Sequence, residues 1–390
     1  MILYGIEVFL KYKIYSKYQK KKIALLCNQA SVDFNFKLTS VIFKEIFGNN
    51  FKFIFSPQHG FFSEKQANMI GSEDEVDLFT GVPIISLYGP RLKPEKEHLD
   101  EIDTIFVDLP EVGCRVYTYI WTLYLLMSAC EEAGKELIIL DRPNPIGGYI
   151  EGPLLEPEYF SFVGLESIPL RHGLTIGELA ILFKKRKFKN LKLEIIPMEG
   201  YKKNYFFPEL KRNWIFPSPN MPSWKTALVY PGQVLLEGTN LSEGRGTTLP
   251  FLIFGAPYIK IKELQKIFSE IFSPEKDGFV LRPVVFEPTF DKWEKQRCYG
   301  FEIQVLNYKK YKPVKTTLLI MKEIKKLYSD FNFIPPPYEF ERKRRPIEIL
   351  LGNSQILKWL ENKEEIDINV YLEYNLKNYQ EEIKSYYLYE

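Results

Sequence analysis

The chain has 390 residues, 45% of them hydrophobic and 15% aromatic, which is enough to bury the cores of about two domains. Its 52 Lys and Arg residues nearly balance its 50 Asp and Glu residues, so charge gives no basis for nucleic acid or an anionic membrane as a partner. The chain shows neither an apolar stretch of about 18 residues nor the pattern of a signal peptide, so we expect a soluble, cytoplasmic protein.

Short apolar runs alternate with helical patterns through the first half of the chain. In chain order, the sequence predicts a strand at KIALLCN, a helix near 38–47, strands at FKFIF, PIISLYG and DTIFVDL, a helix at TYIWTLYLLMSACEEAG, a strand at ELIILDRPNP, a helix at TIGELAILFKK and a strand at LKLEIIPM. Strands that are apolar throughout, separated by helices, indicate an α/β fold with a mostly parallel sheet covered by helices on both faces.

The second half has a different texture. Residues 200–250 are rich in Pro, Gly, Asn and Ser, which indicates mainly loop at a domain junction that lines a cleft. Beyond them, strands near 279–286 and 300–307 and helices near 261–271 and 313–328 indicate a smaller α+β domain, followed by about 50 residues of mixed helix and strand. We therefore predict an N-terminal domain over 1–225 and a C-terminal α+β domain over 226–390, with an active-site cleft at their junction.

Polar side chains follow the predicted strands, at the point where each strand ends. They are Asn28, the stretch from Ser56 to His59, Tyr88, Asp108 and Asp141. The carboxyl ends of parallel strands meet at one edge of a sheet, which is where open α/β sheets bind ligands. This edge is therefore expected to hold the chemistry.

Several familiar site motifs are missing. The first strand continues as QASVD without the glycines of a dinucleotide-binding fingerprint, and no P-loop, GxSxG or HExxH pattern occurs. The four cysteines, Cys27, Cys114, Cys130 and Cys298, form no CxxC pair, so we expect buried free thiols. We therefore expect neither a cofactor nor a metal ion.

Carboxylates and their usual partners make up the remaining candidates. Glycosidases use a carboxylic acid to protonate the leaving oxygen and usually a second carboxylate as base or nucleophile. The candidate carboxylates are Glu64, Asp108, Glu111, Asp141, Glu151, Glu237 and Glu243, and the polar residues that accompany them are Arg115, Arg142, Arg171, Arg245, Asn144, Asn220 and Asn240. The sequence supplies these groups but not the distances between them.

Some candidates also have structural interpretations. These are a turn cap for Asp141 with Asn144, a local ion pair for Glu243 with Arg245, a place before a capped helix for His172, and the core of an apolar helix, in place of a sugar platform, for Tyr117. Both kinds of interpretation stay open at this point.

Eight motifs, in order along the chain, resemble the exo-β-N-acetylmuramidase family. They are FSPQHGFFSE, TGVPIISLYG, DLPEVGCRVYTYIWTL, LDRPNPIGG, EGPLLEP, SFVGLESIPLRHGLTIGELA, PSPNMPSWKTALVYPG and EGTNLSEGRGTTLPF. The resemblance implies a Rossmann-like N-terminal domain, a smaller C-terminal domain and a cleft between them. It also implies hydrolysis of a terminal β-linked N-acetylmuramic acid from the non-reducing end of peptidoglycan fragments, in cell-wall turnover and recycling.

The loop at Gln58 departs from the family's wording. The family usually has Pro-Glu-His-Gly there, with the glutamate as the residue to carry over as catalytic, whereas this chain has Gln58 before His59. A carboxamide has no proton to donate at neutral pH. Three hypotheses follow: Glu64, Asp108 or Glu111 supplies the acid; Gln58 orients a water or the acetamido group while another carboxylate transfers the proton; or the protein binds muropeptides or amino sugars without cleaving them.

The remaining residues receive binding roles from their chemistry. Muramic acid differs from glucosamine by a lactyl carboxylate, which a guanidinium binds well, so Arg171 and Arg245 are its expected ligands, with Arg142 behind them. His59 is expected to bond the sugar or tune a neighbouring carboxylate. The other substrate-binding candidates are Asn28, Asn144, Asn220, Asn240, Tyr117, Arg115, Asp141, Glu151, His172, Glu237 and Glu243.

Overall fold

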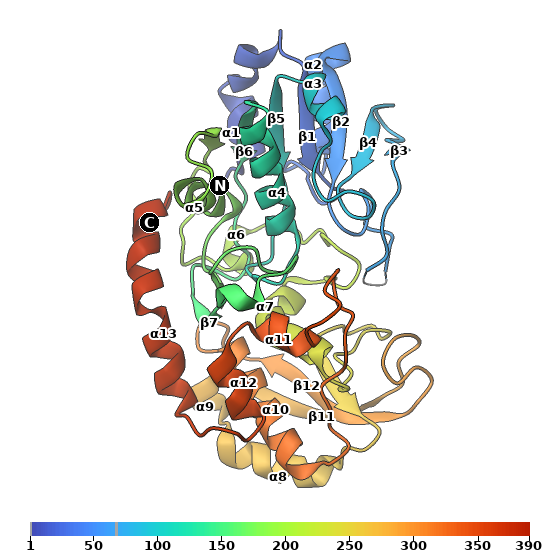
Figure 1. The fold of residues 1–390 in the computed structure, drawn as a ribbon, viewed down its shortest axis with the longest axis vertical. Helices are drawn as coiled ribbons and strands as arrows, with labels where there is room; N and C mark the ends of the chain where they lie inside the picture. The colour runs from blue at the N-terminus through green and yellow to red at the C-terminus, as the bar shows by residue number, and fades with distance from the viewer. Residues whose placement is uncertain (1, 67–68) are drawn as a thin grey trace.

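A computed structural model describes residues 2–66 and 69–390 of the chain. The N-terminal part is built on a seven-stranded sheet in the order β3-β4-β2-β1-β5-β6-β9, in the upper half of Figure 1. Neighbouring strands are parallel except β3 with β4. The strands are β1 (Ile23–Cys27), β2 (Phe51–Ser56), β3 (Glu75–Val76), β4 (Pro83–Ser86), β5 (Thr104–Asp108), β6 (Glu136–Leu140) and β9 (Lys192–Ile196).

Helices cover both faces of this sheet. Within β1, Ala24 and Leu26 belong to the same buried cluster as α4 and α5, whereas Ile23 and Leu25 belong to that of α1 and α2. This division follows because alternate side chains of a strand point to opposite faces. The helices of this part are α1 (Gly5–Lys11), α2 (Thr39–Phe47), α3 (Lys96–Asp100), α4 (Tyr119–Glu132) and α5 (Ile176–Arg186). The predicted Rossmann-like α/β fold is therefore confirmed.

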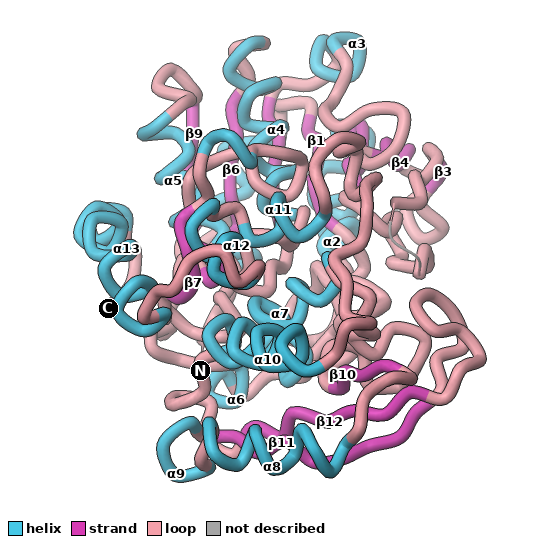
Figure 2. The backbone as a smooth tube through the Cα atoms, turned by 60° about the horizontal axis from the view of Figure 1, so that its bottom comes forward, coloured by secondary structure: helices cyan, strands magenta, loops and turns pink. Residues whose placement is uncertain are grey.

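The C-terminal part contains a smaller, antiparallel sheet in the order β10-β12-β11. Figure 2 shows α8 running alongside β11 and β12. The elements are β10 (Ile253–Ala256), α8 (Ile261–Ile271), α9 (Pro274–Asp277), β11 (Phe279–Phe286), β12 (Cys298–Val305), α10 (Pro313–Leu327), α11 (Pro346–Leu351), α12 (Ser354–Leu360) and α13 (Ile368–Ile383). A further antiparallel pair, β7 (Glu151–Leu154) with β8 (Pro169–Arg171), comes earlier in the chain. The predicted smaller α+β part is confirmed.

The stretch 200–250 is more helical than its composition indicates. It contains α6 (Phe207–Leu210), α7 (Trp224–Gln233) and a 3₁₀ turn over Val234–Gly238. Pro231 lies inside α7 near its C-terminal end, where the missing N–H leaves the carbonyl oxygen of Ala227 without its usual helix partner. At Gly232 an added Cβ would lie 2.0 Å from the carbonyl oxygen of Pro313, so the glycine lets α7 pack against α10. The expected domain boundary between 225 and 226 falls within α7 and stays a prediction.

The C-terminal end corrects a second expectation. Residues 341–390, all of which the structure describes, form α11, α12 and α13 and no strand. Figure 1 shows α13 running along one side of the molecule, from the C-terminal sheet towards the N-terminal one. Arg186 of α5 pairs with Glu382 at 2.7 Å, and the Tyr389 hydroxyl donates to Asp141 at 2.5 Å. The end of the chain therefore ties the two parts together.

Two further expectations concern cysteines and membranes. All four cysteines are buried free thiols, as predicted. Among the helices in the described part of the chain, none is long and apolar enough to cross a membrane.

Candidate active site

The parallel strands β1, β2, β4, β5 and β6 end at one edge of the sheet, as predicted. At this edge the two parts of the chain enclose a narrow pocket of about 30 Å³, called the edge pocket below. Six of the residues singled out in the sequence line it: Gln58, His59, Tyr117, Asn220, Glu237 and Arg245. Gln58 and His59 of the segment FSPQHGFFSE therefore belong to one wall of the pocket. Residues of the C-terminal part, among them Glu237 and Arg245, belong to the opposite wall.

Gln58 is held between two parts of the chain. Its Oε1 accepts a hydrogen bond from Thr118 Oγ1 at 2.5 Å, and its Nε2 donates to Glu339 Oε1 at 3.0 Å. Tyr88 Oη donates to the other oxygen of Glu339 at 2.6 Å. Glu339 is 3% exposed, and burial raises the pKa of its carboxyl although both donors oppose this. A buried carboxyl therefore contacts the residue that replaces the family's glutamate.

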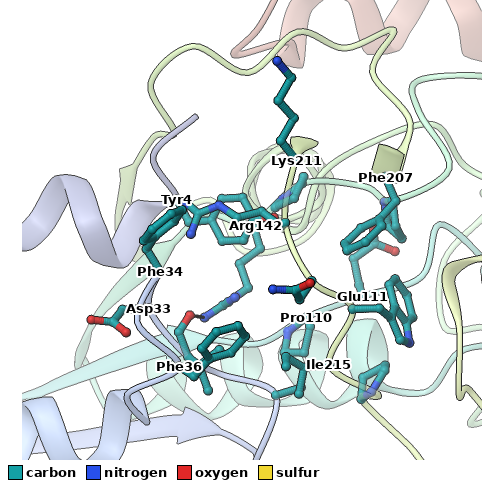
Figure 3. Close-up of a pocket in the computed structure, with 18 residues that line it drawn as sticks. Tyr4, Asp33, Phe34, Phe36, Pro110, Glu111, Arg142, Phe207, Lys211 and Ile215 are labelled. Carbon is teal, nitrogen blue, oxygen red and sulfur yellow. Dashed lines mark hydrogen bonds between the residues drawn. The ribbon is translucent and has the colours of Figure 1, made fainter. Parts of the chain in front are cut away.

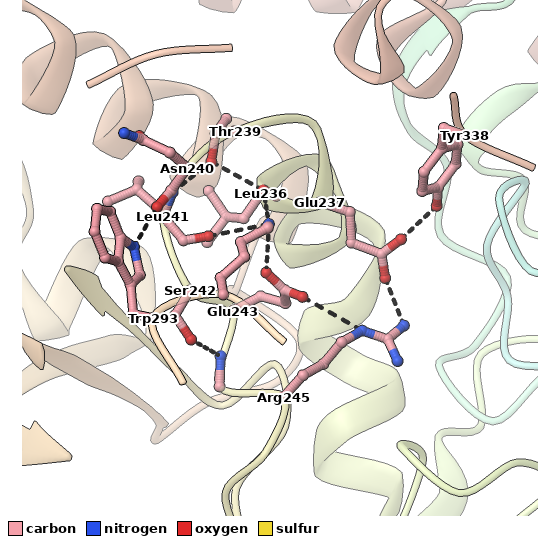
Figure 4. Close-up of polar contacts among 12 residues, drawn as sticks. Leu236, Glu237, Thr239, Asn240, Leu241, Ser242, Glu243, Arg245, Trp293 and Tyr338 are labelled. Atoms are coloured by element: carbon pink, nitrogen blue, oxygen red, sulfur yellow. Dashed lines mark hydrogen bonds and ion pairs between the residues drawn. The ribbon is translucent and has the colours of Figure 1, made fainter. Parts of the chain in front are cut away.

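A cluster of buried charges forms the second wall, shown in Figure 4. Arg245 Nη2 donates to Glu237 Oε1 at 2.6 Å, and Arg245 Nε lies 3.3 Å from Glu243 Oε1. Lys292 Nζ donates to Glu243 at 2.7 Å, and the Tyr338 hydroxyl donates to Glu237. Burial alone would raise the pKa of Glu237, but Arg245 and Tyr338 outweigh it and lower that pKa. Glu243 keeps a raised pKa, because burial outweighs Lys292.

His59 is neutral at physiological pH. Burial lowers its pKa to about 4. Nδ1 lies 2.7 Å from the carbonyl oxygen of Lys65, and since a carbonyl only accepts, Nδ1 must carry the proton. The other ring nitrogen, Nε2, is then a hydrogen-bond acceptor suited to a sugar hydroxyl.

The edge pocket also concentrates unusual backbone conformations. His59, Phe251 and Glu339, none of them glycine, have φ values of 75°, 62° and 44°. Non-glycine residues rarely adopt the left-handed region, and such conformations persist mainly at functional sites that hold them in place. This favours the edge pocket as the functional site.

Asp108 and Arg142 form an ion pair of their own. Arg142 Nε donates to Asp108 Oδ1 at 2.5 Å, and Thr39 Oγ1 donates to Oδ2 at 2.5 Å. Asp108 is fully buried, so its oxygens are committed to holding the end of β5. The structure thus places Asp108 apart from Gln58, contrary to the expectation of one catalytic set.

Glu111 belongs to a second cavity of about 230 Å³, shown with Arg142 and several aromatic side chains in Figure 3. One carboxylate oxygen of Glu111 accepts from the Gly113 N–H and lies 3.3 Å from Nε2 of the fully buried His172. His172 Nδ1 accepts from the Leu174 N–H at 3.2 Å. Glu111 and His172 therefore brace the loop after β5, and neither lines the edge pocket.

The asparagines separate in the same way. All four donate a side-chain amide proton to a backbone carbonyl, and Asn220, which bonds that of Gln66 at 3.1 Å, is the one of the four that also lines the edge pocket. The bonds of the other three run from Asn28 to Pro217 at 2.8 Å, from Asn144 to Leu174 at 3.0 Å and from Asn240 to Asp330 at 2.7 Å. Asn28 and Asn144 are buried, and hydrogen bonds of this kind satisfy a buried amide and stabilise the local loop structure.

Asp141 caps the start of α5. Its Oδ1 accepts from the Gly177 N–H at 2.7 Å, and its Oδ2 accepts from Thr175 Oγ1 at 2.8 Å and from Tyr389. Thr175 and Glu178 form a capping box at the start of α5, which is the capped helix that the sequence indicated after His172. The cap for Asp141 therefore lies on α5, and not on the turn with Asn144 that the sequence indicated.

Glu64 and Arg115 both lie outside the edge pocket, Glu64 on the surface and Arg115 in the interior. The Glu64 side chain is 48% exposed and lies 3.5 Å from Lys65 Nζ. Arg115 is fully buried and donates only to backbone carbonyls in the contacts described for it. Neither arrangement supports the catalytic or substrate-binding role expected of these residues.

Glu151 and Arg171 line a third cavity of about 480 Å³. Glu151 Oε1 accepts from the Lys315 N–H at 2.8 Å, and Arg171 donates to the carbonyl oxygen of Ile146. The Arg171 guanidinium also lies 5.3 Å from the ring centre of Tyr149. The sequence led us to expect Arg171 and Arg245 at one site, but the structure places them in different cavities.

The replacement Glu151→Gln is expected to change how stability depends on pH. Burial raises the pKa of Glu151 from 4.5 to about 7, with Arg171 opposing. Because the folded pKa exceeds the unfolded one, the stability contributed by the protonated form is complete below about pH 4.5 and is lost as pH rises through about 7. Glutamine has no charge, so the variant should be more stable than the wild type at pH 8 by up to about 3 kcal/mol.

Urea unfolding at pH 5 and pH 8 measures this difference. At pH 5 the two proteins should agree within about 1 kcal/mol. Glu270→Gln, an exposed position on α8, serves as the control and should show no dependence. A stability difference of the same size at both pH values would contradict the prediction.

The edge-pocket residues that were not singled out in the sequence include Thr118, Tyr338 and Glu339. Glu339 stands in the segment IPPPYEF, where a Tyr-Glu pair after three prolines was the one available signal. Among the described residues, no group of three or more His, Cys, Asp or Glu side chains could hold a metal ion.

Together, the fold and the edge pocket define an α/β protein whose sheet edge and C-terminal part enclose buried carboxyl groups, the side chains of a glycoside hydrolase. Comparison with known families agrees. The model "Exo-beta-N-acetylmuramidase NamZ, N-terminal" matches residues 23–225, and "Exo-beta-N-acetylmuramidase NamZ, C-terminal" matches residues 228–389. The chain belongs to the exo-β-N-acetylmuramidase family, as the eight motifs predicted.

Relatives and solved structures support this assignment over the full length. The chain is 41% identical over 374 residues to the peptidoglycan β-N-acetylmuramidase NamZ of Bacillus subtilis (strain 168), covering 95% of this chain and 87% of that protein. Crystal structures of two DUF1343 family proteins from Bacteroides fragilis superpose with TM-scores of 0.87 and 0.76, at 29% and 30% identity. Each comparison covers 100% of this chain and 99% of the other.

Proposed function

We propose that this protein is a glycosidase that releases terminal β-linked N-acetylmuramic acid from the non-reducing end of peptidoglycan fragments. The observation that carries the proposal is the edge pocket, where buried Glu237 and Glu339 meet Gln58 and His59. Such a site offers a carboxyl group for proton transfer in surroundings shielded from water. Family membership supplies the substrate class, since the Bacillus subtilis relative is named for the same activity.

The edge pocket has to widen when a sugar binds. Ligand pockets typically measure about 300–1,000 Å³, far more than the 30 Å³ enclosed here. Its walls come from different parts of the chain, with Gln58 and His59 on the sheet edge and Tyr338 and Glu339 before α11. We propose that these walls separate to admit the sugar and that the contact between Gln58 and Glu339 forms again when the pocket closes.

Polar residues of the edge pocket suit an amino sugar. His59 offers a ring nitrogen acceptor to a hydroxyl, and Asn220 offers an amide. Of the three arginines considered for the lactyl carboxylate, Arg245 is the one that lines this pocket, whereas Arg142 and Arg171 line other cavities. We therefore propose Arg245 for that role.

The decisive assay measures hydrolysis of a chromogenic β-N-acetylmuramide by the wild type and by Gln58→Glu, with binding of free N-acetylmuramic acid measured by calorimetry. We expect turnover by the wild type and a much lower rate on the matching β-N-acetylglucosaminide, because the latter lacks the lactyl carboxylate. Tight binding without turnover in the wild type, together with large activity gained by Gln58→Glu, would identify a binding protein instead.

We further propose that the enzyme acts in the cytoplasm on muropeptides or saccharides recovered from cell-wall turnover. The four buried thiols are free, and unpaired cysteines are usual where the compartment is reducing. The nearly neutral charge agrees with a small saccharide as partner, without nucleic acid or membrane.

A further inference from the structure

The proposed reaction needs a proton donor, and Gln58 cannot be one because its amide has no proton to give at neutral pH. The three carboxyl groups considered from the sequence are badly placed for the task. Glu64 is exposed and pairs with Lys65, Asp108 is bound by Arg142, and Glu111 lies against His172 outside the edge pocket. Two buried carboxyl groups line the edge pocket, Glu237 and Glu339. Arg245 and Tyr338 lower the pKa of Glu237, so Glu339 is the better proton donor.

Glu339 lines the edge pocket and contacts Gln58 directly. The amide of Gln58 is oriented by Thr118, which donates to its oxygen, so its nitrogen faces Glu339 Oε1 at 3.0 Å. Tyr88 fixes the other carboxyl oxygen at 2.6 Å. Gln58 and Tyr88 thus hold the two oxygens of one buried carboxyl group in the wall of the edge pocket.

The backbone around Glu339 is held in a strained conformation. Glu339 and Phe340 have φ values of 44° and 67°, and both are residues with side chains. The Phe340 ring lies 5.4 Å from the rings of Tyr88 and Phe162, which anchors the segment. Strain that neighbouring packing maintains at a pocket is typical of a functional position.

We propose that Glu339 is the general acid of the glycosidase reaction and that Gln58 is the positioning residue that replaces the family's glutamate. The inference rests on the proposed hydrolysis and assigns the proton donor within it. In the step, the C1–O bond of the muramic acid breaks, its electron pair stays on the leaving oxygen, and that oxygen takes the proton of Glu339. One water supplies the new oxygen on C1, and the proton that this water loses restores the acid form of Glu339 through solvent.

The surroundings favour the protonated form. Burial raises the pKa of the Glu339 carboxyl; the Tyr88 and Gln58 donors lower it, the charge of Glu237 raises it, and Arg245 lowers it. His59, which also faces the pocket, is neutral because its own pKa is lowered to about 4. Because Gln58 carries no charge, the contact between positions 58 and 339 contains a single carboxyl group that can titrate. With a glutamate at position 58, two carboxyl groups about 3 Å apart would share a proton.

The test compares two substrates that differ in the need for an acid. A sugar leaves poorly without protonation, whereas an acidic phenol leaves well, so removal of a general acid should harm only the disaccharide severely. For Glu339→Gln we expect kcat/KM on N-acetylmuramyl-β-1,4-N-acetylglucosamine to fall about 10² to 10⁴-fold, and on the nitrophenyl β-N-acetylmuramide about tenfold or less. Glu270→Gln, exposed on α8, is the matched control and should equal the wild type on both substrates.

Position 58 gives a second readout. Gln58→Glu should move the alkaline limb of kcat/KM to higher pH, because a second carboxyl group raises the pKa at which the pair loses its last proton. Gln58→Ala should lower kcat on the disaccharide while KM changes little, because the Glu339 carboxyl group then loses the hydrogen bond that positions it.

The outcomes separate the two proposals. Equal losses on both substrates in Glu339→Gln, or no loss, would overturn the assignment of Glu339 while leaving the hydrolase intact. A wild type that cleaves neither substrate, although calorimetry shows sugar binding, would overturn the proposed function and this inference with it.

Discussion

Replacing Arg245 with methionine is expected to lower the free energy of unfolding at pH 7 by about 3–5 kcal/mol. Arg245 lies between Glu237 and Glu243, and all three side chains are buried. Breaking a buried ion pair from one side leaves a carboxylate without its main counter-charge, in surroundings where water cannot compensate. The loss should exceed that of an ordinary truncation of a long side chain.

The pH dependence of this loss gives a specific signature. Arg245 is the main group that lowers the pKa of Glu237 against the effect of burial. Without it, burial dominates and the folded pKa of Glu237 should lie above its unfolded value. The added instability is then present at pH 8 and diminishes as the pH falls and Glu237 takes up a proton.

Urea unfolding of Arg245→Met at pH 5 and pH 8 measures both effects. The matched control is Arg282→Met, which removes an arginine that pairs with Glu302 but is 59% exposed. Exposed pairs contribute about 1 kcal/mol or less, so the control should lose little. Similar losses in the two variants, or a loss independent of pH, would show that the cluster does not stabilise the fold as argued.

Replacing Arg115 with methionine is expected to cost about 3–5 kcal/mol of stability while leaving the substrate preference of the folded protein unchanged. Its guanidinium donates to the carbonyl oxygens of Ile168 at 3.1 Å, Leu350 at 2.5 Å and Leu351 at 3.1 Å, and weakly to that of Pro153. The contacts join residues near β7 and β8 to α11. Methionine fills similar space but leaves these buried acceptors without donors.

Two measurements on Arg115→Met test this structural role: the midpoint temperature of thermal unfolding, and KM at a temperature well below that midpoint. The control is Arg342→Met, which replaces an exposed arginine shortly before the start of α11 and should leave the midpoint temperature unchanged. A stable Arg115→Met protein with a raised KM would instead return Arg115 to the substrate-binding set.

The edge pocket shows how far sequence patterns reach. FSPQHGFFSE could be placed at the carboxyl end of a strand because the apolar run before it was continuous, and the structure has β2 ending at Ser56. The contact that gives Gln58 its importance joins it to a residue 281 positions away in the chain. No spacing rule along the chain connects two such residues.

The polar candidates show the same limit. Asp108, Asp141 and Asn28 all lie at the ends of strands of the parallel sheet, as predicted, yet each side chain bonds a structural partner at least 34 residues away in the chain. Residue type and strand order place a group at an edge, but the packing of loops decides whether it faces a pocket or a neighbouring backbone. The C-terminal helices had a further difficulty, since their patterns are interrupted by aromatic and charged residues.

The sequence by itself determined the α/β architecture, the edge of the sheet that holds the site and the family, because apolar periodicity and ordered motifs are properties of short stretches. Only the tertiary structure decided that Gln58 and His59 share a pocket with Arg245, and that Glu339 completes it. Hydrogen bonds and ion pairs act over a few ångströms, so which distant residues meet depends on how the two parts of the chain pack against each other.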